Sequence, residues 1–202
     1  MSKISAFPDQ TPHPVPPALS DDRPDEAYDM RIARDGTWFY HGSPIGRIAL
    51  VKLFATVLRR DESGDYWLIT PAERGRIKVE DVPFVAVEVR AEGVGEGQSL
   101  AFRTNLDDWV TAGPAHPMRV AYDAVTGGDS PGADLPGADL SESPRPYIVV
   151  RDRLEARISR SVFYELVSLA EERQGPQGIE LGVWSGGIFF SLGALPSTDT
   201  SP

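Results

Sequence analysis

The stretch Asp29–Phe54, DMRIARDGTWFYHGSPIGRIALVKLF, decides the fold because it contains successive elements of different kinds. Residues 30–32 alternate between apolar and polar, and they lead into Asp35-Gly36, a dipeptide typical of tight hairpin turns. Residues 38–40, Trp-Phe-Tyr, are aromatic and favour a strand. The start of the stretch therefore predicts a β-hairpin.

The second half of the stretch predicts a helix. Ser43-Pro44 has the composition of a helix N-cap followed by proline at the first helical position. In residues 45–58 the polar side chains fall on one side, so we expect this helix to lie on a sheet. Strands are predicted next at residues 66–70 and 76–80. Residues 29–80 thus follow the order strand, strand, helix, strand, strand.

The same order of elements recurs in residues 147–192. Two strands precede a helix that Ser159 or Ser161 can cap and that extends to Glu172, and two more strands follow. Both units carry an Arg-Asp dipeptide near their first turn, Arg34-Asp35 and Arg151-Asp152. We predict an α+β protein with more strand than helix, built of two duplicated strand-strand-helix-strand-strand modules with extra antiparallel strands between them.

The composition along the chain predicts where these modules begin and end. The predicted segments are a disordered arm (residues 1–27), an N-terminal module (28–82), a C-terminal module (83–195) and a disordered tail (196–202). Residues 126–146 are rich in Gly, Pro and Asp and contain the sequence PGADL twice. We expect them to form a mobile loop within the C-terminal module.

Composition and charge exclude several classes of protein. The chain has 202 residues, no Cys and a net charge of −10, so it has no disulfides or thiolate chemistry, and its acidic balance argues against nonspecific DNA binding. No apolar run approaches the roughly 20 residues that a membrane-spanning helix needs. The N-terminal segment lacks the apolar core of a signal peptide. We therefore expect a cytoplasmic protein that binds neither DNA nor membrane.

The sequence contains no clear catalytic or metal-binding motif. His41 and His116 stand alone without ligand spacing, so we expect no metal and no cofactor. Ser185, in GVWSGG, lacks the spacing of a nucleophile elbow and is better explained by a tight turn between strands. The carboxylates of Glu73, Glu80 and Asp81 are the candidates for acid–base catalysis, although such groups more often pair with arginine or close a turn.

The strongest functional signal is a cluster of arginines in the second unit. Five arginines fall within residues 145–160: Arg145, Arg151, Arg153, Arg157 and Arg160. Guanidinium groups that converge are suited to binding phosphate or carboxylate. The alternative is a solvated strand face whose arginines pair with nearby Asp and Glu.

Several stretches resemble a bacterial family called domain of unknown function 1285. These are the stretch quoted above, LITPAE (residues 68–73), IKVEDVPFVAVE (77–88), FRTN (102–105), and the later runs PYIVVR, LEARISRSVFYELV and WSGGIFF. The resemblance implies two duplicated modules, of which the second is superficially similar to a pleckstrin-homology fold. It also implies a nucleotide-like ligand between the modules and a role in signal transduction, without any established activity.

We therefore expect a non-catalytic protein that binds a small anionic, nucleotide-like ligand between its modules. The expected roles are contact with phosphate for Arg34, Arg47, Arg151 and Arg157, hydrogen bonds from Thr104 and Asn105, and stacking of a base on Trp38 or Tyr40. One alternative is a protein-interaction adaptor that uses Trp38, Trp184 and the arginine strand as a surface and binds no small ligand. The other is an enzyme that uses Glu73, Glu80 and Asp81.

Overall fold

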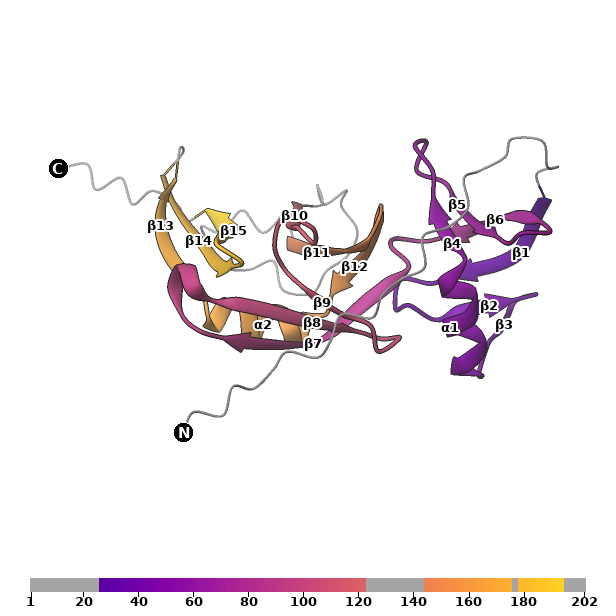
Figure 1. The fold of residues 1–202 in the computed structure, drawn as a ribbon, viewed down its shortest axis with the longest axis horizontal. Helices are drawn as coiled ribbons and strands as arrows, with labels where there is room; N and C mark the ends of the chain where they lie inside the picture. The colour runs from indigo at the N-terminus through magenta and orange to yellow at the C-terminus, as the bar shows by residue number, and fades with distance from the viewer. Residues whose placement is uncertain (1–25, 123–143, 176–177, 195–202) are drawn as a thin grey trace, which may run out of the picture.

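The computed structural model describes residues 26–122, 144–175 and 178–194, which form two modules side by side (Figure 1). The N-terminal module ends at residue 79 and the C-terminal module begins at residue 84, so residues 80–83 are a short linker. Buried side chains of both modules belong to one hydrophobic core. As predicted, the fold contains far more strand than helix, with two nine-residue α-helices among the described residues.

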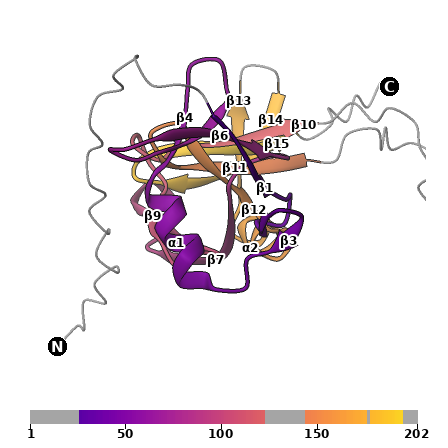
Figure 2. The ribbon, with the colours of Figure 1, turned by 90° about the vertical axis from the view of Figure 1, so that its right-hand side faces the viewer.

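The N-terminal module is a six-stranded sheet with a helix on one face (Figure 2). Its elements are β1 (Glu26–Ile32), β2 (Trp38–Tyr40), β3 (Ser43–Pro44), α1 (Ile48–Thr56), β4 (Leu58–Arg60), β5 (Tyr66–Ile69) and β6 (Arg74–Val79). The strand order is β3-β2-β1-β6-β5-β4, and every neighbouring pair is antiparallel except β1 and β6. A parallel pair needs a long connection, and α1 lies within it.

The first hairpin forms as predicted, but the helix starts later than predicted. Gly36 has φ +82° in the turn, and the Thr37 N–H donates to Asp35 Oδ1 (2.9 Å). Ser43-Pro44 does not cap a helix, because it forms β3 and pairs with β2. The Ile45 N–H then donates to a β2 carbonyl (2.8 Å), so the chain stays extended and α1 begins only at Ile48.

The C-terminal module contains one six-stranded and one three-stranded sheet. Its elements are β7 (Phe84–Glu92), the 3-10 turn η1 (Gly95–Gly97), β8 (Ser99–Thr104), β9 (Trp109–Thr111), β10 (Met118–Tyr122), β11 (Pro144–Arg151), β12 (Leu154–Ile158), α2 (Arg160–Ser168), β13 (Glu171–Gly175), β14 (Gly178–Ser185) and β15 (Ile188–Ala194). The large sheet has the order β10-β11-β12-β7-β8-β9, with β12 and β7 parallel. The small sheet is β13-β14-β15, and α2 packs against β7 and β14.

The order of elements recurs between the modules, but the pairing of the strands does not. In the first unit, the strands before and after α1 share one sheet through the β1–β6 pair. In the second unit, β11 and β12 join β7, whereas β14 and β15 belong to a separate sheet. The predicted duplication of the strand-strand-helix-strand-strand unit is therefore wrong at the level of sheet pairing. The likeness to a pleckstrin-homology fold stays a prediction.

The second helix is shorter than predicted. Ser159 caps it by accepting a hydrogen bond from the Val162 N–H (3.4 Å). The helix ends at Ser168, and Glu171 and Glu172, which were expected within it, pair with β14 as part of β13. This strand is exposed on both sides, so it lacks the alternation that marks a strand in a sequence.

The predicted arm, loop and tail lie mostly outside the described residues. The described ends of the arm and the loop, Ala27 and Pro144–Pro146, are part of β1 and β11. In the part of the chain that the structure describes, neither helix has the length and hydrophobicity needed to cross a bilayer.

Candidate functional site

The predicted site residues of the N-terminal module do not meet in one cavity. The Arg34 and Arg47 side chains are exposed, and neither guanidinium forms a hydrogen bond or ion pair with a described residue. Tyr40 is 52% exposed, with its ring beside His41. Trp38 is only 2% exposed and stacks on Phe54 at 6.4 Å between ring centroids. Since Trp38 is a core residue, a ligand base cannot stack on it.

Thr104 stabilises the turn between β8 and β9, and Asn105 connects that turn to the N-terminal module. Thr104 is fully buried, and its hydroxyl accepts hydrogen bonds from the backbone N–H groups of Leu106 and Asp108 (both 3.2 Å). The Asn105 amide accepts from the Val85 N–H (3.0 Å) and donates to the Gly36 carbonyl (3.4 Å) in the first hairpin. Thr104 is too deeply buried to reach a ligand, whereas a hydrogen bond from Asn105, which is half-buried, to a ligand stays a prediction.

Arg151 crosses from the C-terminal module to the end of α1. Its side chain is 10% exposed, lies over the Phe84 ring and donates to the Ala55 carbonyl, with Asp108 Oδ2 3.7 Å away. Burial lowers the pKa of Arg151, and Asp108 opposes this shift. A cation at the C-terminus of a helix offsets the helix dipole. Arg151 is therefore an interface residue in this structure, and its contact with phosphate stays a prediction.

Direct ion pairs also join the two modules. Lys52 Nζ lies 2.8 Å from Asp107, Arg153 Nη2 lies 3.0 Å from Glu62, and Arg60 Nη1 lies 3.7 Å from Glu155. The junction is thus occupied by protein side chains over much of its area. A cavity large enough for an anion lies beside this junction rather than within it.

Such a cavity, of about 590 Å³, lies where β12 ends and α2 begins. We call it the arginine pocket. Its described lining residues are Val85, Pro144, Arg145, Pro146, Arg157, Ile158, Ser159, Arg160, Phe163 and Tyr164. Three of the five clustered arginines line it, and the described part of the lining contains no acidic residue. Of the site residues predicted from the sequence, Arg157 alone is in this set.

The arginines reach the pocket from different elements. Arg145 comes from the start of β11, Arg157 from the end of β12, and Arg160 from the first turn of α2. Arg160 is exposed and forms no hydrogen bond or ion pair with a described residue. Phe163 and Tyr164 follow on α2, and the Tyr164 ring is 60% exposed. The pocket therefore combines cations with accessible aromatic surface.

Arg157 also has an acidic neighbour behind the pocket. Its Nη1 lies 3.8 Å from Asp81 Oδ2, and the Tyr147 hydroxyl donates to the other oxygen of Asp81 (3.0 Å). Burial and this hydrogen bond raise the pKa of Tyr147. Asp81 is in the linker between the modules, so the pocket is connected to the junction through one arginine.

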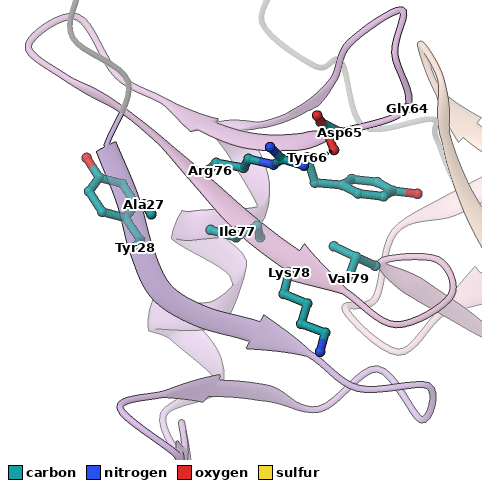
Figure 3. Close-up of a pocket in the computed structure, with 9 residues that line it drawn as sticks. All are labelled: Ala27, Tyr28, Gly64, Asp65, Tyr66, Arg76, Ile77, Lys78 and Val79. Carbon is teal, nitrogen blue, oxygen red and sulfur yellow. Dashed lines mark hydrogen bonds and ion pairs between the residues drawn. The ribbon is translucent and has the colours of Figure 1, made fainter.

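A second cavity, of about 390 Å³, lies on the N-terminal module along β1, β5 and β6 (Figure 3). It contains two basic residues, Arg76 and Lys78. Arg76 is paired with Asp65 at 2.6 Å, and Figure 3 shows the Lys78 side chain directed away from both. Its cations do not converge, so we consider it the weaker candidate.

The candidate catalytic residues do not form a catalytic group. Glu73 precedes β6, whereas Glu80 and Asp81 follow it, and a six-residue strand is about 20 Å long. Glu80 pairs with Arg31, which lowers the pKa of Glu80. The buried Ser185 hydroxyl donates to the Ala112 carbonyl (2.7 Å) and accepts from the Leu100 N–H (2.9 Å), which is a structural role. Among the described residues, no cluster of His, Asp and Glu could hold a metal ion.

Comparison with known families identifies the chain. Residues 17–82 match the family described as "Domain of unknown function (DUF1285), N-terminal domain", and residues 83–138 and 133–192 match "Protein of unknown function (DUF1285), C-terminal domain". The chain belongs to the DUF1285 family. The DUF1285 match thus begins its C-terminal part at residue 83, within the linker between the two modules.

Solved DUF1285 structures are similar to this chain. A DUF1285 family protein from Silicibacter pomeroyi DSS-3 is 43% identical, with a TM-score of 0.73 over 86% of this chain and 85% of that one. A DUF1285 family protein from Shewanella baltica OS155 is 22% identical, with a TM-score of 0.46 over 70% of this chain and 91% of that one. No curated protein matches the chain.

In this DUF1285 protein, sequence reasoning missed most of the arginine pocket. Arg145 and Arg160 belong to the cluster that the sequence revealed, but their convergence depends on the sheet bringing the start of β11 beside the end of β12. Phe163 and Tyr164 were not among the predicted site residues. The available signal was the Ser159 cap, because it places Arg160 at the start of a helix directly after the strand that carries Arg157.

Proposed function

We propose that this DUF1285 protein is a non-catalytic protein that binds a small anionic, nucleotide-like ligand in the arginine pocket and serves in signal transduction. The observation that carries the proposal is the composition of the pocket. Three arginines and two aromatic residues line it, and its described lining contains no carboxylate. A ligand with an anionic group attached to a flat ring matches both kinds of residue.

The size of the pocket supports this ligand class. Small-molecule sites generally occupy about 300–1,000 Å³, and this pocket has about 590 Å³. Guanidinium forks bind phosphate and carboxylate through paired hydrogen bonds. The exposed Tyr164 ring offers a face on which a base or another flat ring can stack.

The pocket also lies close to the boundary between the modules. An added Cβ at Gly36 of the first hairpin would lie 3.2 Å from Val85 Cγ2, and Val85 lines the pocket. The expectation of a ligand between the modules is therefore kept in modified form. The proposed site belongs to the C-terminal module and borders the N-terminal hairpin.

The test is ligand binding by the purified protein and two arginine variants. Mononucleotides, inorganic phosphate and phenyl phosphate are screened by thermal shift, since a ligand that binds only the folded state raises the melting temperature. Arg160→Gln should weaken binding about tenfold or more, because a hydrogen bond to a charged group is lost. It should leave the melting temperature unchanged, because Arg160 is exposed and unpaired among the described residues.

Arg47→Gln is the matched control. Arg47 is also exposed and unpaired among the described residues, but it does not line the pocket. Affinity should therefore stay as in the unmodified protein. Equal losses in both variants, or no binding of any compound, would overturn the proposal.

A protein-interaction adaptor is the second candidate, and one observation favours it. Trp184 and Phe189 form an edge-to-face pair with ring centroids 5.3 Å apart on the small sheet, and Arg173 lies over both rings. Aromatic residues and arginine are common in the energetic centre of protein interfaces. If the ligand screen is negative, this surface becomes the leading functional candidate.

A further inference from the structure

Arg157 is shared between the arginine pocket and the junction of the modules. On one side it lines the pocket, and on the other its Nη1 lies 3.8 Å from Asp81 Oδ2. The charge of Arg157 also acts on Asp35 in the first hairpin of the N-terminal module. Hydrogen bonds from Thr37 are the main reason that the pKa of Asp35 is low, and Arg157 contributes to the same effect. The Arg157 guanidinium is thus close to Asp81 in the linker, and its charge adds a minor contribution at Asp35 in the hairpin.

The negative charge of Asp81 is stabilised by the nearby guanidinium of Arg157. The Asp81 side chain is 12% exposed, and only one of its two oxygens accepts a hydrogen bond from a described residue, the Tyr147 hydroxyl. The other oxygen, Oδ2, is buried and has no hydrogen-bond partner among the described residues, so the charge of Arg157 is its nearby compensation. A buried carboxylate oxygen in this position attracts the guanidinium away from any other anion.

We propose that Asp81 is a built-in competitor of the ligand for Arg157, and that this competition couples occupation of the arginine pocket to the linker between the modules. The inference rests on the proposed function, because it concerns the same pocket. An anion in the pocket shares or takes over the Arg157 guanidinium, which leaves Asp81 less well compensated. Since coupling is reciprocal, any change that releases Arg157 from Asp81 strengthens ligand binding.

Variants of Asp81 and of Tyr147, which donates a hydrogen bond to it, are predicted to change the affinity for an anion in opposite directions. Asp81→Asn keeps an oxygen that can accept the Tyr147 hydrogen bond but removes the charge, so the affinity for an anion should rise, by about fivefold or more. Tyr147→Phe removes the hydrogen bond that helps to stabilise the negative charge of Asp81. Asp81 then relies more on Arg157, and the affinity should fall. A general destabilisation cannot produce an increase in one variant and a decrease in the other.

Glu165→Gln is the matched control for net charge. Glu165 is exposed on α2 next to Tyr164 but does not line the pocket, so this variant changes the net charge as Asp81→Asn does without touching Arg157. The affinity should change less than twofold, because exposed charges that are not in contact are screened by salt.

The experiment is calorimetric titration of the full chain and its variants with AMP and with inorganic phosphate. The inference is supported if Asp81→Asn binds more tightly than Glu165→Gln, and Tyr147→Phe binds less tightly than the unmodified protein. It is overturned if Asp81→Asn and Glu165→Gln behave alike while Arg160→Gln still weakens binding, and in that case the proposed function stands. If no variant binds either probe, both are overturned.

Hydrogen exchange provides a second measurement that does not depend on the stability of the variants. With the unmodified protein, saturating AMP should increase amide exchange in residues 80–82 of the linker, because their carboxylate loses part of its compensation. Unchanged or slower exchange in the linker, together with measurable AMP binding, would contradict the coupling.

Discussion

Replacing Arg151 with methionine should lower the stability of the protein and leave ligand binding intact. Methionine preserves much of the apolar contact over Phe84 but removes the donor to the Ala55 carbonyl and the charge near Asp108. Leaving a buried acceptor unsatisfied costs about 1–3 kcal/mol, and losing the partner of a largely buried charge adds to this. We expect a total loss of about 2–4 kcal/mol, because Asp108 can regain some hydration.

The measurement is urea unfolding followed by circular dichroism, supported by the melting temperature. For a chain of this size, 1 kcal/mol corresponds to about 2–4 °C, so the loss should appear as a decrease of about 4–16 °C. Arg153→Met is the matched control, since Arg153 is two positions further on and its side chain is 53% exposed. Its partner Glu62 is 91% exposed, so this exposed pair should contribute less than about 1 kcal/mol.

Two results would refute this reasoning. If Arg151→Met and Arg153→Met lose equal stability, the contact with α1 has no special role. If Arg151→Met keeps its stability but loses affinity for an anion, the original prediction from the sequence, in which Arg151 binds the ligand, is restored.

Three further outcomes follow from single contacts. Ser185→Ala should lose about 2 kcal/mol or more in urea unfolding, because two buried backbone groups lose their partner, whereas the exposed Ser168→Ala should change little. Gly75→Ala should lower the melting temperature, since its Cβ would lie 2.2 Å from the Tyr28 ring, while a Cβ at Gly46 would meet nothing within 4 Å. The folded state raises the pKa of Tyr147, so the stability contributed by its neutral form is complete below the ordinary pKa near 10 and is lost as the pH rises through the folded value. Unfolding measured above pH 10 should therefore depend less steeply on pH in Tyr147→Phe than in the unmodified protein.

The sequence was sufficient to predict the local elements where pattern and turn chemistry agree. Asp35-Gly36 forms its turn, and the strands predicted at residues 66–70 and 76–80 form as β5 and β6. Ser43-Pro44 misled the prediction because the same dipeptide suits a helix start and an edge strand, and pairing with β2 decided between them. Tertiary pairing also created β13 from residues that carry no strand periodicity.

The candidate site was harder to predict, because burial and partners are not visible in a sequence. Trp38, Thr104 and Arg151 have the chemistry of ligand-binding residues, yet each is used inside the protein. The arginine cluster did indicate a functional region. In the structure, however, Arg151 and Arg153 contact the N-terminal module, whereas the other three arginines line the pocket. Which arginine joins which group depends on sheet register, and the register places Arg157 opposite Tyr147 and beside Val85.

The contact between Arg151 and the end of α1 also affects how the chain folds during synthesis. The two residues are 96 positions apart, so the ribosome releases α1 well before the arginine that completes it. Domains at the N-terminus of a chain usually fold first and independently. Here the early module is synthesised with an exposed helix end and an open junction face, and both stay open until β11 is made. A fragment that stops before Arg151 should therefore behave as an unfinished folding intermediate.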